Sequence, residues 1–242
     1  MKHVVILISA LAASFLVRAQ TVEGDTIFIK TASAYAIGLY QKKTGAQSHL
    51  YNGRNYRVPP IAGDHHPYFD SFDWVNGTVV YDGYQYTDVP LLYDIYQDKL
   101  ISELPYNAKE YELIPEKVTA FTIGEHRFIR MQKQNVNGAL PATGFYELIY
   151  EGNTQVIARH HKNLYEQVQT TQLTREYREK SRYYILVNKS YYAVNNKRGL
   201  LKLLHNQRQA IRKFMNDENL RFASDKSNTL ARVAAYYDRL TR

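Results

Sequence analysis

The stretch that decides the fold is residues 74–103, WVNGTVVYDGYQYTDVPLLYDIYQDKLISE, where short apolar and aromatic runs alternate with turn dipeptides. Asn76-Gly77 and Asp82-Gly83 are dipeptides that two-residue hairpin turns favour, because both central residues need positive φ. In the run that follows, alternate apolar residues share one face of an extended chain, at Val89, Leu91, Tyr93 and Ile95. This stretch therefore predicts antiparallel β-hairpins.

The same pattern continues towards the C-terminus. Short apolar runs separated by turn residues predict further strands, at 111–114, 118–123, 126–131, 145–150, 155–159, 183–187 and 191–194. Strands that recur this often behind short turns must pair antiparallel, because parallel pairs need longer crossovers. We expect a β-meander, either open or curled into a barrel- or clam-like form.

Helices are expected at the two ends of the mature chain. Residues 33–43 carry a short amphipathic pattern that stops at Gly45, and two helices are expected within about 198–242. The second of these covers 225–240, with Ser224 or Asp225 as its N-cap. The fold class is therefore α+β, with residues 20–242 forming one mostly-β domain; the polar segment 164–180 receives no assignment.

Composition excludes several classes of protein. The chain has 242 residues, no Cys and 22 Tyr, and its formal net charge is +8. Without Cys there is no disulfide framework, thiolate nucleophile or Cys-based zinc site. No phosphate-binding glycine loop and no Gly-x-Ser-x-Gly nucleophile motif is present, so no cofactor and no catalytic residue is predicted.

The N-terminus has the features of a secretory signal peptide. Lys2 and His3 precede an apolar run over 4–16, and Val17-Arg18-Ala19 places small residues where signal peptidase reads them. We expect residues 1–19 to be removed and the protein to be exported. The apolar run is too short for a spanning helix, and no later segment is apolar enough to form one.

Charge is divided unevenly along the chain. Residues 20–150 carry 11 basic and 15 acidic side chains, whereas residues 151–242 carry 18 basic and 8 acidic ones. Such a basic half indicates either solvated helix faces or an anionic partner, such as an acidic glycan or a lipid surface. No nucleic-acid-binding motif is present, so nucleic acid is not an expected partner.

Polar clusters suggest only one candidate metal site. His65, His66 and Asp70 combine imidazole and carboxylate groups that could bind a divalent ion, although their spacing matches no metal motif. Adjacent histidines in an extended chain point to opposite sides. The alternative, which we favour, is one packed and one solvated histidine, and the pair His160-His161 is interpreted in the same way.

Aromatic residues of the first hairpins are the candidate ligand-binding residues. Their rings could stack on a sugar or another ring while the hydroxyls donate hydrogen bonds. They are Trp74, Tyr81, Tyr84 and Tyr86. The alternative is that these side chains fill a pleated surface and pair across strands. A second basic and aromatic surface for an acidic polymer could form where Arg175, Arg178, Lys180 and Arg182 precede Tyr183 and Tyr184, although a solvated face is the interpretation we favour.

Several stretches resemble a family of uncharacterised exported proteins of Bacteroidota bacteria. They are residues 50–56 (LYNGRNY), 66–69 (HPYF), 77–100, 144–152 (GFYELIYEG) and Arg212-Lys213-Phe214. The resemblance extends over most of the mature chain. It implies a periplasmic or extracellular location in a Gram-negative bacterium, and it supplies no activity or active-site residue.

Together these observations favour a non-enzymatic, exported cell-envelope module that binds a partner through its β-body. The partner is expected to be an envelope protein or an anionic glycan or lipid surface. Two alternatives remain at this point: a hydrolase acting on envelope glycan or peptide, and a structural subunit of an envelope complex.

Overall fold

The computed structural model describes residues 49–61, 65–104, 107–169 and 172–241, which belong to one compact unit, His49–Arg242. The signal peptide expected at 1–19 and the helix expected at 33–43 lie outside the described residues.

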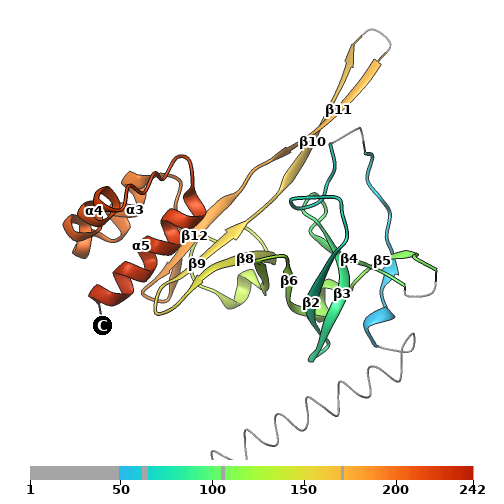
Figure 1. The fold of residues 1–242 in the computed structure, drawn as a ribbon, viewed down its shortest axis with the longest axis horizontal. Coiled ribbons are helices and arrows are strands. Elements are labelled where there is room, and N and C mark those ends of the chain that lie inside the picture. The colour runs from blue at the N-terminus through green and yellow to red at the C-terminus, as the bar shows by residue number, and fades with distance from the viewer. Residues whose placement is uncertain (1–48, 62–64, 105–106, 170–171, 242) are drawn as a thin grey trace, which may run out of the picture. The chain divides into compact units, whose positions relative to one another are not determined.

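An eleven-stranded sheet forms the body of this unit (Figure 1). In spatial order its strands are β1 (Arg54–Asn55), β5 (Glu110–Glu112), β4 (Lys99–Glu103), β3 (Tyr84–Asp94), β2 (Val75–Tyr81), β6 (Val118–Ile123), β7 (His126–Met131), β8 (Gly144–Glu151), β9 (Gln155–Arg159), β12 (Arg182–Val187) and β13 (Ser190–Ala193). All neighbours pair antiparallel. The predicted antiparallel sheet is confirmed, but β1 and β13 do not pair, so the sheet is not closed into a barrel.

One of the two expected hairpin turns is correct. Asp82 and Gly83 connect β2 to β3, and both have positive φ, at 53° and 82°. Asn76-Gly77 instead lies inside β2, where Gly77 pairs with Val89 of β3. A Cβ at Gly77 would lie 2.0 Å from the Thr122 carbonyl oxygen, so close packing against β6, and not a turn, requires this glycine.

The β13 edge of the sheet is covered by a loop. Gly138 bridges to Tyr191 in parallel orientation. The Tyr191 N–H donates to the Asn137 carbonyl at 2.9 Å, and the Ala139 N–H donates to the Tyr191 carbonyl at 2.8 Å. The outward-facing backbone groups of Tyr191 are therefore bonded.

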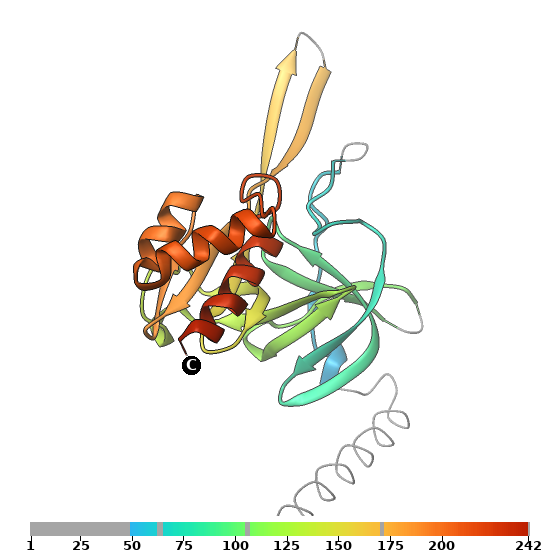
Figure 2. The same cartoon turned by 60° about the vertical axis from the view of Figure 1, so that its left-hand side comes forward.

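Two further strands, β10 (Lys162–Gln169) and β11 (Gln172–Glu179), form a separate two-stranded ribbon. It occupies most of the segment that the sequence left unassigned, and it extends beyond the sheet in both views (Figures 1 and 2). Its root is fixed by the Lys162 ammonium, which donates to the Tyr68 carbonyl at 2.6 Å, and by an edge contact between Tyr96 and Tyr177.

The chain ends in helices, as expected. They are α3 (Lys197–Leu203), α4 (Arg208–Asp217) and α5 (Lys226–Leu240), with a 3-10 turn, η6 (His205–Gln207), between the first two. The first of the two predicted C-terminal helices is thus two helices. The predicted N-cap of the last one is correct, because the Asp225 side chain accepts from the Asn228 N–H. The other 3-10 turns are η3 (His49–Tyr51), η4 (Pro115–Lys117) and η5 (Lys133–Asn135).

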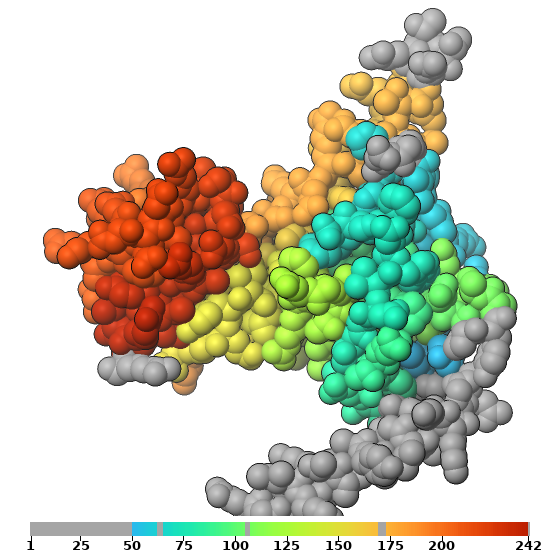
Figure 3. All heavy atoms as spheres, in the orientation of Figure 1, coloured from blue at the N-terminus to red at the C-terminus, as the bar shows by residue number. Residues whose placement is uncertain are grey.

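The helices cover the part of the sheet that contains β9 and β12. Leu230 and Val233 of α5 pack with Val156 and Ile185 of the sheet, and Figure 3 shows these helices closely packed beside the strands. Asp238 of α5 is buried, and its carboxylate accepts from the Thr154 N–H and the Tyr150 hydroxyl. The other large core lies among β2–β8 and includes fully buried Tyr81, Tyr93, Phe121 and Phe128.

Candidate functional site

Two adjacent histidines at the end of β9 lead to two different polar sites. Cβ positions alternate along an extended chain, so His160 and His161 point to opposite sides. His160 enters a closed cluster of ionised groups, and His161 lines an open hollow.

The closed cluster joins β7, β8 and the end of β9 through the Glu147 carboxylate, and His160 extends it to Glu179 of β11. Glu147 of β8 contacts His126 Nδ1 of β7 at 2.5 Å and His160 Nε2 at 2.8 Å. On its other side, His160 Nδ1 lies 2.8 Å from Ser181 Oγ and 3.4 Å from the Glu179 carboxylate. The Phe69 ring packs on both imidazoles at 5.0 Å.

These contacts place the residue types of a Ser–His–Glu nucleophile triad together, but the Ser181 hydroxyl is directed at Glu179 and not at the histidine. The Ser181 hydroxyl donates to Glu179 at 3.1 Å, so its oxygen accepts from His160 Nδ1. A general base would instead have to accept the hydroxyl proton. Both ring nitrogens of His160 are therefore donors, which is the bonding pattern of an imidazolium.

The pKa values in the cluster agree with this protonation. Burial alone would lower the pKa of His160, but its hydrogen bonds to Glu147 and Glu179 raise that pKa to about 8. Burial would raise the pKa of Glu147, and the bonds from His160 and His126 outweigh it, so that pKa is lowered. The cluster is a set of ion pairs that ties the root of the ribbon to the sheet.

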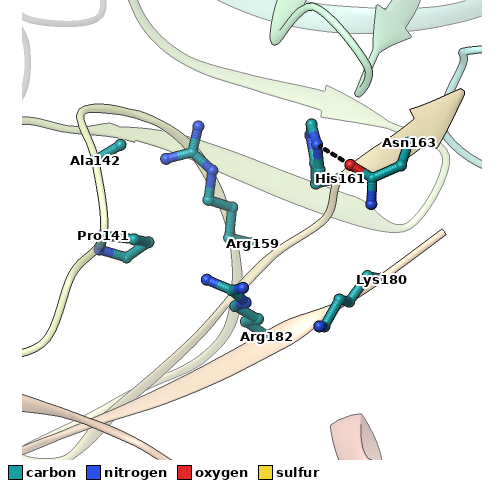
Figure 4. A pocket seen from close by; sticks show the side chains of 7 residues that line it. All are labelled: Pro141, Ala142, Arg159, His161, Asn163, Lys180 and Arg182. Atoms are coloured by element: carbon teal, nitrogen blue, oxygen red, sulfur yellow. Dashed lines mark hydrogen bonds between the residues drawn. The ribbon is translucent and has the colours of Figure 1, made fainter.

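The hollow lies on the opposite side of the same strands. Its volume is about 360 Å³, and its polar lining residues are Arg159, His161, Asn163, Lys180 and Arg182. In Figure 4 the guanidinium groups of Arg159 and Arg182 extend from neighbouring strands beside the loop that carries Pro141 and Ala142. A volume of this size falls at the lower end of the roughly 300–1,000 Å³ range of small-ligand pockets.

Strand register concentrates positive charge in this hollow. Arg159 and Arg182 are direct cross-strand partners, and the Lys180 N–H bonds to the His161 carbonyl one step further along. Two basic side chains thus lie directly opposite each other, an arrangement that destabilises a sheet unless an anion compensates it.

Among the described residues, only Arg159 of these three cations has an acidic partner. The Arg159 guanidinium lies 3.2 Å from the Asp98 carboxylate and donates to the Tyr146 hydroxyl at 3.3 Å. Burial would lower the pKa of Arg159, but Asp98 outweighs it and raises that pKa. Within the described part of the chain, Lys180 and Arg182 form no ion pair, and no acidic side chain lines the hollow.

A ring contact and two hydrogen bonds order the remaining wall. The Arg159 guanidinium carbon lies 5.4 Å from the centre of the Tyr146 ring. His161 Nδ1 faces the Ile95 carbonyl at 3.2 Å, and its Nε2 faces the Asn163 side-chain oxygen at 3.1 Å (Figure 4). The hollow is therefore positioned by the sheet and not by a loose loop.

The four aromatic candidates do not meet at one surface. Tyr81 and Tyr86 are buried in the core among β2–β8. Trp74 is half-buried against a small cluster formed by Tyr56, Tyr68, Leu92 and Ile101. Tyr84, at the start of β3, is the exposed member of the set, at 46%.

The candidate metal ligands also lie in different surroundings. His65 and Asp70 are exposed, and Asp70 has a positive φ of 57°. The half-buried His66 ring stacks on Tyr68, with ring centres 5.9 Å apart. Across the described ranges, no group of three His, Asp or Glu side chains is arranged to hold a metal ion.

Sequence reasoning found part of the hollow. It grouped Lys180 and Arg182 as neighbours, but it placed them with Arg175 and Arg178, which belong to the ribbon. Arg159 was missed. The sequence does carry a signal for this hollow, because basic residues alternate at 159 and 161 and again at 180 and 182. That signal indicates a shared site only once the two segments are known to pair.

Comparison with protein-family models, curated proteins and solved structures finds no match to this chain. Within the described residues, every helix is too short or too polar to cross a lipid bilayer.

Proposed function

We propose that this chain is a non-enzymatic module of the bacterial cell envelope that binds an acidic group of its ligand in the basic hollow. The observation that carries the proposal is the opposed pair Arg159 and Arg182, extended by Lys180, for which Asp98 is the one acidic partner among the described residues. A bound carboxylate or phosphate supplies the missing negative charge and accepts charge-assisted hydrogen bonds from the guanidinium groups.

The binding proposal is tested with small anions. Isothermal titration at constant ionic strength would use inorganic phosphate and glucuronate as probes. The double variant Lys180→Gln/Arg182→Gln should weaken binding at least about tenfold, because each charge-assisted hydrogen bond contributes about 1.5–3 kcal/mol.

The matched control removes two charges outside the hollow. Lys109→Gln/Lys189→Gln changes two exposed lysines and should bind the probes as the unmodified protein does. Equal affinity of the hollow variant and this control would contradict the proposed site.

The non-enzymatic part of the proposal rests on the Ser181–His160 contact. With Nδ1 donating to the serine oxygen, the serine lacks a base, so a fluorophosphonate that labels activated serine nucleophiles should leave Ser181 unmodified. Labelling that disappears in Ser181→Ala would support the alternative hydrolase function.

The envelope location rests on the N-terminal pattern and the resemblance to exported Bacteroidota proteins. Expression in a Gram-negative host should release a mature product in the periplasmic fraction, and N-terminal sequencing should find Gln20 as its first residue. Retention of the uncleaved chain in the cytoplasm would contradict this location.

A further inference from the structure

The helical layer carries a second concentration of positive charge, distinct from the hollow. Five exposed basic residues lie on two consecutive helices, Arg198 and Lys202 on α3 and Arg208, Arg212 and Lys213 on α4. We call these five residues the α3–α4 basic patch. Residues 180–216 contain no Asp or Glu at all.

Within the described residues, no ion pair to an acidic side chain neutralises this patch. Across the described chain, none of its five residues takes part in an ion pair or a side-chain hydrogen bond. Elsewhere in the same layer, by contrast, Arg232 pairs with Glu218 at 2.6 Å, and the Arg239 guanidinium lies over the Tyr236 ring.

The spacing within the patch adds to its repulsion. Arg198 and Lys202 are four residues apart, as are Arg208 and Arg212, so each helix carries a like-charged pair on one face. Such pairs destabilise a helix slightly. The helices fold because their other faces are buried, through Leu200 and Leu201 on α3 and Ile211 and Met215 on α4.

The chemistry of the patch favours a surface of point charges over a ligand with rings. The aromatic residue of α4, Phe214, is stacked on Tyr236 at 4.2 Å with Arg232 near its ring, and α3 has no aromatic residue. The exposed ring of Tyr192 lines a hollow with Lys202, but it belongs to β13 and not to the helices that carry the patch. Single-stranded nucleic acids are typically held by stacking on open aromatic rings, and glycan rings can use the same contacts. Anionic lipid headgroups need only cations near the surface.

We propose that the α3–α4 basic patch binds the protein peripherally to a membrane surface that contains anionic phospholipids. Each Lys or Arg close to such a surface strengthens binding about fivefold. The interaction is electrostatic and therefore weakens with increasing salt. It uses none of the residues of the hollow, so it stands independently of the proposed ligand site.

Vesicle flotation tests this inference. The protein should float with vesicles of phosphatidylcholine and phosphatidylglycerol but not with vesicles of phosphatidylcholine alone. The triple variant Arg208→Gln/Arg212→Gln/Lys213→Gln should bind the mixed vesicles at least about tenfold more weakly, since three cations are lost.

The control variant loses the same charge elsewhere. Arg54→Gln/Arg57→Gln/Lys109→Gln changes three exposed basic residues outside the helices and should float as the unmodified protein does. Circular dichroism of both triple variants would verify that their helix content is retained. Equal loss in both, or loss in neither, would overturn the proposed patch.

Two competitors separate the lipid surface from other anions. Soluble glycerol phosphate should not displace the protein from vesicles at equal ionic strength; displacement would indicate a single-headgroup site and overturn the surface proposal. Heparin or single-stranded DNA that binds the α3–α4 basic patch more tightly than mixed vesicles would overturn it in favour of a soluble polyanion.

Discussion

His160 and His161 are neighbours in the sequence, yet the balance of acidic and basic side chains around them differs. That balance determines what each region can do. In the cluster around His160, Glu147 and Glu179 lie on either side of the imidazole and balance its charge. The hollow around His161 has Lys180 and Arg182 without acidic partners. A closed, balanced cluster stabilises the fold, whereas an open, unbalanced one is available to an external anion.

The largest effect is expected from removing the charge at the centre of the closed cluster. Glu147→Gln leaves His126 and His160 without their shared carboxylate, and breaking a mostly buried ion pair costs about 3 kcal/mol or more. Urea unfolding at pH 6 would measure the loss. Glu151→Gln, at an exposed pair with Arg127, is the control and should change the free energy of unfolding by less than about 0.5 kcal/mol.

A smaller effect is expected from pH. The pKa of His160 is raised to about 8 in the folded chain, above its usual 6.5. Its stabilising contribution is therefore complete below pH 6.5 and is lost as the pH rises through 8, a change of about 2 kcal/mol. Urea titrations between pH 6 and pH 9 would follow it, with His160→Gln as the control that lacks most of this change.

The carboxylates of the same cluster affect the free energy of unfolding at acidic pH. The pKa values of Glu147 and Glu179 are lowered from 4.5, so their contribution is present above that pH and is lost as the pH falls below it. For His160, a free energy of unfolding that does not change between pH 6 and pH 9 in the unmodified protein would contradict its assignment as an imidazolium.

The smallest change in the free energy of unfolding is expected in the hollow, where a substitution should increase stability and not decrease it. Arg182→Gln removes a cation that directly opposes Arg159, so the free energy of unfolding should increase by about 0.5 kcal/mol while phosphate binding weakens. Thermal unfolding with and without phosphate would measure both quantities. A variant that is less stable and still binds phosphate would show that Arg182 has a structural role.

Local sequence patterns predicted most of the sheet because each strand carries its own alternation and its own turn. The Asp82-Gly83 turn is correct since nothing else constrains those residues, whereas Asn76-Gly77 was wrong because a tertiary contact with Thr122 uses the glycine inside a strand. The ribbon β10–β11 escaped prediction because both of its faces are largely polar. Its register pairs Glu166 with Arg175, and no apolar alternation marks a buried side.

The candidate site was harder to predict than the fold. Lys180 and Arg182 stood out as a local run, but their partner Arg159 is 23 positions from Arg182 and meets it only through the pairing of β9 with β12. The aromatic candidates Tyr81 and Tyr86 failed to form a surface for the reason that Tyr also suits a core: its ring is large and apolar enough to be buried. Composition reveals which residues are numerous, and only register reveals which of them meet.

An open sheet of eleven strands could grow by recruiting strands from other molecules, and the two margins of this sheet limit that hazard. One margin is β1, which has only two residues, and at the other the backbone of Tyr191 is already bonded to residues 137–139. At these two margins, the short β1 and the bonded Tyr191 leave little backbone as a template for a further strand. In this sheet, a short strand and a covering loop protect the margins that a barrel would remove by closure.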